Sequence, residues 1–506
     1  MSLNQSMNIS LNSMKNNQYA LTVVSQNIAN LHVEGYHRQR VDFQTNRYTT
    51  DCENVISTIK GMNGASISSL SDFIDEGLFN EGIGANSDAQ YYNTLADALA
   101  GLEDIADDLG DNGLNALLND FFKASANLEQ FPTDMTIRQQ YVLAAQNICD
   151  KFNEISAKYD SLQDDKFQNI QSDVEVINSL LADLALANEA HVKANQSSDT
   201  QVKINDILKQ LSNYMEVTTD KNANGTCNIY LGDMALVEGN VQKFEIQAEF
   251  DSTNPDKAVS FKLQSTEKED FVITSNVTES FTNGSMKAYI DFLNGSGNGF
   301  SNVNDMKANL NSAASAFANA LNGIQTYDDG TIFAASLTTI DGEIALEKAT
   351  EPMFVGTGGV IDASNIKVNS AIVENPFLVS AARIDLDKYP DGGWEKSIGN
   401  SDNATLITAL QNENICSYGG GVNNCTLSQF LINNAAKNGM DTANIIGKAE
   451  TYQGVADSLA TDYANITGVN LDEELADMIK YQRAFEASAK VFSTVNDIIG
   501  TIIGMV

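Results

Sequence analysis

The sequence predicts an α+β protein of several domains. Long terminal helices are expected to form a coiled-coil-like domain, followed inward by a mainly helical middle domain and an inserted antiparallel β domain on the outside. Three observations support this. Apolar residues recur every seven positions at both ends of the chain, the first 131 and last 116 residues lack proline, and residues 216–283 alternate apolar and polar side chains. The chain of 506 residues has room for several domains of ordinary size.

The N-terminal segment is expected to be a helix with one apolar edge. An apolar residue recurs at every seventh position, and a second such row is interrupted by Ser10 and Asn17. A strict seven-residue period is typical of a coiled-coil seam rather than of an ordinary surface helix. The main row consists of Met7, Met14, Leu21 and Ile28, and the second row retains Leu3, Val24 and Leu31.

The C-terminal segment shows the same period over a longer stretch and has a distinct start. Asn470 can cap the first turn of a helix, and Glu473, three residues later, can return the bond to the cap. The acidic residues 472–474 suit the positive end of the helix dipole. The seven-residue row is Leu471, Met478, Phe485, Phe492, Ile499 and Val506, with Leu475, Ala489 and Ile503 beside it.

Between the two ends, the pattern changes from helical to strand-like and back. Residues 88–215 have helical periodicity, which Pro-Thr-Asp at 132–134 interrupts before a new helix begins. The alternation over 216–283 predicts a small antiparallel β domain, and helix is expected again over 285–324. Short strands should follow through about residue 395, with helix again from 402.

We divide the chain into four parts on this basis. Each helical part is built from segments that are distant in the sequence, because the β segment interrupts the helices that pack together. The parts are a terminal helical assembly domain (1–50 with 461–506), a helical core domain (51–215 with 285–325 and 402–460), the inserted β domain (216–284) and a short strand-rich segment (326–401).

The charge of the chain argues against some classes of partner. The formal net charge is −37, and an acidic surface repels both nucleic-acid backbones and anionic lipid. No run of about 20 apolar residues is present, so neither nucleic acid nor a membrane is expected as a partner. Residues 1–50 differ, with four basic and two acidic residues. We expect this basic arm to dock against acidic residues 472–474, in the same or an adjacent subunit.

A metal or catalytic site is a poor explanation of the polar motifs. His32, Glu34 and His37 are close in sequence, but Gly35 interrupts a helical register and zinc sites usually assemble three or four ligands. The segment from Asp220 to Leu231 begins like a calcium loop but ends in leucine, so a hairpin turn is expected. No catalytic or nucleotide-binding motif is recognisable. We therefore expect a non-enzyme without a cofactor.

The five cysteines are scattered along the chain. Only Cys416 and Cys425 are close enough in sequence to suggest a local disulfide. Two unpaired thiols at the ends of a flexible loop are an equally good interpretation, and the sequence does not decide between them.

Two terminal motifs resemble a known family. The stretch LTVVSQNIANLHVEGYHRQR (21–40) resembles the N-terminal signature of bacterial flagellar rod, hook and hook-associated proteins, and GVNLDEELADMIKYQRAFEASAKVFSTVNDIIGTIIGM (468–505) resembles their C-terminal signature. Arg38 and Gln39 after Gly-Tyr, together with the GVNLDEE opening, are most similar to the hook-associated members at the junction of hook and filament. Val33 and Glu34 depart from the Thr-Pro that the family often has there.

The resemblance implies an expected function and an assembly surface. It implies a structural protein exported through the flagellar type III apparatus to the outside of the cell, where a ring of like subunits contacts hook protein and the second junction protein, and hence the filament. A flagellar export chaperone is a further expected partner. The expected assembly residues are Met7, Met14, Leu21, Asn27, Ile28, Asn30, Gly35, Tyr36, Arg38 and Gln39 with Asn470, Leu471, Glu473, Leu475, Met478, Gln482, Phe485, Phe492 and Ile499.

Other functions remain open from the sequence. The nearest alternative is another flagellar axial protein, either the hook or the distal rod subunit, because the terminal signatures are shared across the family. A secreted adhesin or a glycan hydrolase is a more distant alternative. Carboxylates are abundant enough for hydrolysis, but no local pattern singles out a pair.

Overall fold

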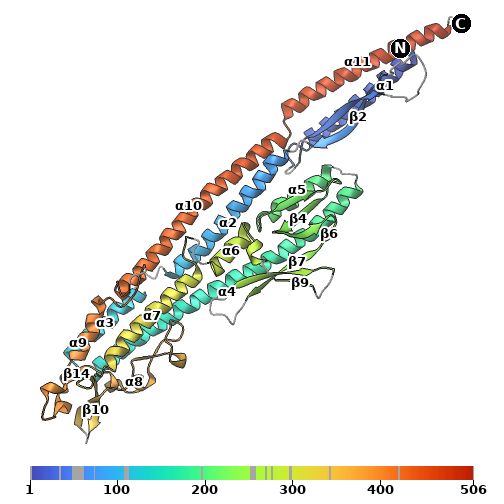
Figure 1. Ribbon diagram of the computed structural model, residues 1–506. Helices are drawn as coiled ribbons and strands as arrows, with labels where there is room; N and C mark the ends of the chain where they lie inside the picture. The colour runs from blue at the N-terminus through green and yellow to red at the C-terminus, as the bar shows by residue number, and fades with distance from the viewer. Residues whose placement is uncertain are drawn as a thin grey trace.

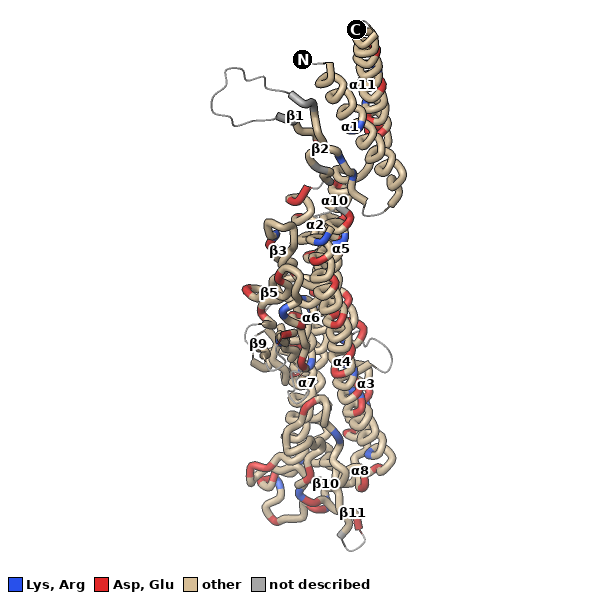
Figure 2. The backbone as a smooth tube through the Cα atoms, turned by 90° about the vertical axis from the view of Figure 1, so that its right-hand side faces the viewer, with Lys and Arg blue, Asp and Glu red and all other residues tan. Residues whose placement is uncertain are grey.

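The protein is an elongated helical body with both chain ends together at one tip, as seen in a computed structural model from two sides (Figure 1 and Figure 2). The predicted α+β multidomain class is confirmed. Of the helices in the described part of the chain, none combines the length and the apolar content that crossing a bilayer requires. The structure describes residues 3–33, 36–47, 62–72, 75–106, 113–194, 198–250, 258–267, 271–274, 277–295, 299–340, 343–419 and 422–504.

The helices carry most of the length of the body. The longest, α4, spans 59 residues, and α10 spans 41 residues. The α-helices in the described ranges are α1 (Leu3–Ala29), α2 (Glu76–Ala106), α3 (Leu114–Gln130), α4 (Met135–Lys193), α5 (Ser198–Leu211), α6 (Gly284–Asn294), α7 (Val303–Gln325), α8 (Ser370–Glu374), α9 (Asp402–Ala409), α10 (Leu427–Thr467) and α11 (Leu471–Gly504).

Local sequence signals fix the ends of the core helices. The predicted break at residues 132–134 is confirmed, because α3 ends at Gln130 and Asp134 then caps α4 by accepting bonds from the amides of Thr136 and Ile137. Helix α10 begins with a capping box, in which Thr426 and Gln429 exchange side-chain and backbone bonds. These caps satisfy amides that a helix leaves without partners at its start.

Two long helices, α2 and α10, lie side by side along the body (Figure 1). The rings of Tyr92 and Tyr452 stack across this pair with centroids 4.7 Å apart. Beside them, Asn93 donates to Gln453 at 2.9 Å. Because α10 runs directly into the turn before α11, this pairing connects the core to the terminal helices.

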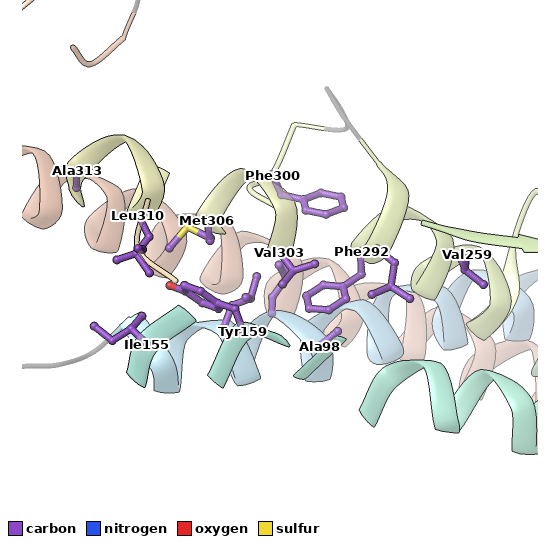
Figure 3. Packing of buried hydrophobic residues seen from close by; sticks show 14 of the residues in the cluster. Ala98, Ile155, Tyr159, Val259, Phe292, Phe300, Val303, Met306, Leu310 and Ala313 are labelled. Carbon is purple, nitrogen blue, oxygen red and sulfur yellow. The ribbon is translucent and has the colours of Figure 1, made fainter. Parts of the chain in front are cut away.

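The main hydrophobic core lies where α2, α4, α6 and α7 meet. Figure 3 shows Tyr159 of α4 lying against Met306 and Leu310 of α7, with Phe292 and Val303 further along the same layer. Phe292 and Val303 are fully buried. Burying such a side chain contributes roughly 1.5–3 kcal/mol, so this layer is a major source of the body's stability.

The strands form small antiparallel sheets outside the helices. The predicted β domain is present beside α4 as two sheets, with strand orders β3-β4-β5-β6 and β7-β8-β9. The expected turn in the calcium-like segment is confirmed, because the Gly225 amide bonds to the Asn222 carbonyl in the β3–β4 hairpin. The strands are β3 (Thr218–Lys221), β4 (Cys227–Leu231), β5 (Met234–Glu238), β6 (Val241–Gln242), β7 (Phe244–Phe250), β8 (Val259–Ser265) and β9 (Val272–Ile273).

A second strand-rich region occupies the end of the body opposite the chain termini (Figure 1). Its three-stranded sheet has the order β11-β10-β14, and β12 pairs with β13. The position of these strands agrees with the strand-rich segment expected at 326–401, whose boundaries stay a prediction. The strands are β10 (Ile332–Ile340), β11 (Glu343–Lys348), β12 (Phe354–Val355), β13 (Lys367–Val368) and β14 (Ala382–Asp385).

Asparagine side chains on helices attach strands to the helical body. Asn188 of α4 accepts a bond from the Cys227 amide at 3.0 Å and donates to the Cys227 carbonyl at 2.8 Å. A side-chain amide carries the same donor and acceptor as a peptide group, so it can pair with a strand as another strand would. The same reciprocal bonds join Asn178 to Ile246, Asn294 to Val259 and Asn322 to Phe354.

A buried arginine holds α4 to the second strand-rich region. The Arg138 side chain is 1% exposed and donates to the carbonyls of Pro132, Pro376, Phe377 and Val379. Burial lowers the pKa of Arg138 to about 10. The fork of guanidinium donors thus ties one short turn of the chain, residues 376–379, to the start of α4.

Candidate functional site: the joint of the terminal helices

The terminal helices α1 and α11 lie side by side at one tip of the molecule (Figure 1). A hairpin of β1 (Gln39–Arg47) and β2 (Met62–Asp72) packs on α1. The small core between these elements contains Ala20, Val23 and Val41, with Ile67 and Tyr481 at its edge. This core is separate from the main core of the body, so the tip forms its own structural unit.

The face of α1 that is most deeply buried is not the main apolar row. Ser10 and Val24, from the interrupted second row, are 5% exposed, whereas Met7 and Met14 are half-buried. Ser13 and Ser488 share a hydrogen bond of 2.8 Å between α1 and α11. The most deeply buried residues of α1, Ala20, Val23 and Asn27, belong to neither row. The apolar rows of the sequence therefore do not mark the buried face of this helix.

Helix α11 uses only part of its apolar surface against α1. Met478, Phe485, Phe492 and Ile499 are half-buried, and Val495 is buried. Leu471, Leu475 and Ile479, which we call the first flank, lie on one side of this row with exposures of 42%, 43% and 52%. Val491, Ile498 and Ile502, the second flank, lie on the other side with exposures of 50%, 43% and 48%.

Asn27 is the centre of a polar joint between the basic arm and α11. Its side chain is fully buried. The Oδ1 atom accepts from the Tyr36 hydroxyl at 2.9 Å and the Gln39 amide at 3.1 Å. The Nδ2 atom donates to the Gln39 carbonyl and to Glu474 Oε2, each at 2.9 Å. Both ends of the amide are therefore satisfied, as a buried polar group requires.

Arg38 provides the second link across the joint. Its Nε donates to Glu474 Oε1 at 2.6 Å and its Nη1 to Glu473 Oε2 at 2.5 Å. Desolvation by burial lowers the pKa of Arg38, but the Glu474 carboxylate, with Glu473, outweighs it and raises the pKa overall. The Arg38 amide also bonds to the Thr467 carbonyl at 2.8 Å. The expected pairing of the basic arm with the acidic start of α11 is confirmed within one chain.

The start of α11 is shaped by the same residues. Asn470 Oδ1 accepts from the Asp472 amide at 3.0 Å, so the predicted cap is confirmed. Glu473, which we expected to return a bond to the cap, instead has its carboxylate on Arg38. Glu474 is 1% exposed, because it lies one turn before Met478 on the face that meets α1.

The structure brings together only some of the expected residues. Tyr36 and Gln39 bond to Asn27, and Arg38 bonds to Glu474, which Asn27 also contacts. Asn30 donates to the Gln26 carbonyl of its own helix and is not part of the joint. Gln482 is exposed on α11. Gly35 lies outside the described residues. Glu474 was expected among the acidic partners of the basic arm but not among the assembly residues, although its spacing from the apolar row of α11 placed it on the buried face.

The histidines near the joint do not converge. His32 is exposed, and His37 is buried with its ring edge-on to Tyr463, 5.6 Å between centroids. Glu34 lies outside the described residues. Across the described ranges, no group of three or more His, Cys, Asp or Glu side chains could hold a metal ion. What this site can do chemically is form directional contacts that fix one helix against another.

The comparisons with known proteins point to the flagellum. Residues 99–330 match the family model of the flagellar hook-associated protein FlgK helical domain, and residues 461–505 match that of the flagellar basal body rod FlgEFG protein C-terminal region. The chain is 22% identical to flagellar hook-associated protein 1 of Bacillus subtilis, covering 96% of this chain and 95% of that protein. It is 24% identical to flagellar hook-associated protein 1 of Salmonella typhimurium, covering 96% and 97%.

A solved structure shares the fold. The flagellar hook junction protein FlgK from Burkholderia pseudomallei superimposes with a TM-score of 0.59 at 12% identity, covering 76% of this chain and 99% of that one. The resemblance seen in the terminal motifs is therefore confirmed by matches that extend through the middle of the sequence. The chain belongs to the flagellar hook-associated protein 1 family of structural flagellar proteins.

Proposed function

We propose that this chain is a structural subunit of the hook–filament junction, located outside the cell. In that position it binds hook protein on one side and the second junction protein, and hence the filament, on the other. The full-length likeness to hook-associated protein 1 of two bacteria supports this. The arrangement of the terminal helices supports a role in assembly rather than in turnover, and we propose that the protein has no enzymatic activity.

The two exposed flanks of α11 carry this proposal. They lie on opposite sides of the row that meets α1, so each copy can offer one flank to a neighbour and receive a different surface on the other side. Such heterologous contacts generate rings or open helical assemblies. Covering the exposed half of six aliphatic side chains contributes about 1 kcal/mol each, or roughly 6 kcal/mol per subunit before ordering costs.

The polar joint has a supporting part in this proposal. It fixes the direction in which α11 leaves α10, because Arg38 holds both the last turn of α10 and the first turn of α11. An assembly in which α11 packs against neighbours requires that direction to be the same in every copy. We propose that the expected assembly residues other than Asn30 and Gln482 act either in this joint, as Asn27 and Arg38 do, or on the apolar surfaces beside it.

Export is part of the same proposal. The chain would leave the cell unfolded through the flagellar export apparatus, with a chaperone covering its terminal helices beforehand. The exposed apolar flanks support this, since they would otherwise promote premature association in the cytoplasm.

One observation favours a second candidate, another axial protein such as the hook or distal rod subunit. The C-terminal match is to a model named for rod proteins. The match of residues 99–330 to the FlgK helical domain favours the junction instead. We therefore keep the junction as the proposal.

Filament growth from isolated hooks tests the proposed function. Purified chain is added to hooks, followed by the second junction protein and flagellin, and the fraction of hooks with filaments is counted. We expect growth with the unmodified chain and its loss with Ile498→Asp, which places a charge on the second flank. Asn496→Asp, an equal charge at an exposed polar position two residues away, should preserve growth. Equal growth with Ile498→Asp and the unmodified chain would refute the role of the flank.

A further inference from the structure

Two cysteines face each other where the chain enters α10. Cys416 follows the short helix η6 (Leu410–Asn412), and Cys425 immediately precedes the Thr426 cap of α10. They form an isolated antiparallel bridge, in which the Cys416 amide donates to the Cys425 carbonyl at 3.1 Å and the Cys425 amide donates back at 3.3 Å. The two residues are therefore in register, directly opposite one another.

The backbone geometry of this bridge falls within the range that a disulfide needs. Residues opposite each other in a hydrogen-bonded antiparallel pair have Cα atoms about 5.5 Å apart, and disulfides form over about 4.4–6.8 Å. Both side chains are buried, at 3% and 5% exposure. The Cys425 sulfur points across the bridge, because its Sγ lies 3.6 Å from the Cys416 carbonyl oxygen.

The loop between the cysteines holds this register without help from the sulfurs. Asn424 accepts from the Tyr418 amide at 2.9 Å and donates to the Tyr418 carbonyl at 2.8 Å. The Asn423 amide donates to the Ser417 hydroxyl at 3.0 Å. The backbone thus brings the two thiols together before any bond forms between them.

We propose that Cys416 and Cys425 are a redox-modifiable pair that forms an intrachain disulfide on exposure to a small disulfide oxidant. The thiolate of one cysteine attacks a sulfur of oxidised glutathione and releases one glutathione thiolate, leaving a mixed disulfide on the protein. The second cysteine thiolate then attacks the sulfur of the first cysteine, which forms the intrachain disulfide and releases the second glutathione as a thiolate. The two thiol protons pass to the two released thiolates, so the cysteines are oxidised and the glutathione is reduced.

The bond is expected to form as the chain folds rather than in the closed loop. Burial raises the pKa of Cys416 to about 12, with a further contribution from the neighbouring Cys425 thiol. Because the thiolate is the attacking species, exchange in the folded protein is slow. In the cell, this timing rests on the proposed function, since only a chain that folds outside the cytoplasm meets an oxidising environment as it folds.

Refolding the purified full chain in oxidised glutathione tests the proposal without reference to flagella. Cys416 and Cys425 lie in one tryptic peptide, residues 397–437, because no Lys or Arg occurs between Lys396 and Lys437. After denaturation and alkylation, we expect this peptide to carry no alkyl group and to have lost two hydrogens in mass. The peptides with Cys149 and Cys227, which lie on different elements (α4 and β4), should each carry an alkyl group.

Matched variants separate the pair from general oxidation. Cys416→Ser should leave Cys425 either alkylated or glutathionylated, and dithiothreitol should restore two alkyl groups to the unmodified peptide. The rate of proteolytic cleavage between residues 417 and 424 should be several-fold lower in the refolded oxidised chain than in the reduced chain. In Cys416→Ser, the oxidant should not change this rate. Two alkyl groups or two glutathiones on the peptide after refolding would overturn the proposal. A loss of filament growth in the hook assay would count against the proposed function but not against this disulfide.

Discussion

Replacing the buried carboxylate of the joint should loosen the start of α11 selectively. In Glu474→Gln the side chain keeps its shape but loses its charge, and its new NH₂ group faces either the Arg38 Nε donor or the Asn27 Nδ2 donor. Both of those donors now bond to the Glu474 carboxylate, at 2.6 and 2.9 Å. One of them must lose its acceptor, and the other bond loses its charge assistance.

The magnitude follows from burial. Hydrogen bonds to charged groups contribute about 1.5–3 kcal/mol each, and Arg38 keeps Glu473 as a partner. We therefore expect a loss of about 2–3 kcal/mol in the local opening free energy, which speeds exchange about 30- to 140-fold. The matched control is Glu473→Gln. The Glu473 side chain is 59% exposed, so its loss should cost at most about 1 kcal/mol, or about fivefold in exchange.

Amide hydrogen exchange measured by mass spectrometry reads this effect directly. The Arg38 amide bonds to the Thr467 carbonyl and the Gln39 amide bonds to Asn27 Oδ1, so peptides covering residues 36–42 report on the joint. Exchange in α4 should not change in either variant and serves as an internal reference. Equal acceleration in both variants, or none in Glu474→Gln, would refute the account of the joint.

Three further substitutions test contacts that α4 makes with the β domain, with residues 376–379 and with α6. Asn188→Asp removes the donor to two carbonyls and should destabilise the β domain by about 1–3 kcal/mol, measured by urea unfolding against Asn147→Asp, which is exposed on the same helix. Arg138→Met leaves four buried carbonyls without their donor and should cost about 3–5 kcal/mol, seen as faster proteolysis of residues 376–379; unchanged cleavage would contradict this. Desolvation raises the pKa of Asp173, although the hydrogen bond from Ser285 lowers it in part. The ionised carboxylate therefore lowers the free energy of unfolding at pH values above the pKa of the folded protein. Asp173→Asn should therefore unfold at higher urea at neutral pH, with the difference vanishing as pH falls through the ordinary value of 3.8.

Local patterns in the sequence predicted the elements well. Proline at 132 with Asp134 marked the start of α4, and period-two alternation marked the β domain. The contact between Arg38 and the acidic start of α11 was also predictable, because the basic arm is the exception in an acidic chain. These features depend on residues that are close together or on charge, both of which the sequence displays directly.

Packing between residues that are distant in the sequence could not be predicted from it as well. Nothing in the sequence indicates that Ser10 is buried while Met7 is only half-buried, since that depends on how the elements around α1 pack against it. The burial of Arg138 depends on carbonyls more than two hundred residues away. The bonds of Asn188 to a strand edge are equally invisible, because an asparagine in a helix is more often a solvated residue.

The sequence left open whether Cys416 and Cys425 form a disulfide or are two unpaired thiols, and the structure adds their position relative to each other. The structure places Cys416 opposite Cys425 in a reciprocal backbone pair and has both thiols free. The sequence spacing alone was compatible with two thiols on an unstructured loop. The pair of asparagine bonds that fixes the loop is what makes oxidation of this pair a specific prediction.

The most direct measurement of the central proposal is hydroxyl-radical footprinting of the chain, free and bound to isolated hooks. Leu471, Ile479, Ile498 and Ile502 are 42%, 52%, 43% and 48% exposed in the single chain, and Leu186 on α4 is 63% exposed. We predict that labelling of the four α11 residues falls several-fold on binding to hooks, whereas labelling of Leu186 is unchanged. Persistent labelling of both α11 flanks in hook-bound protein would contradict the proposal that these flanks are the assembly surface.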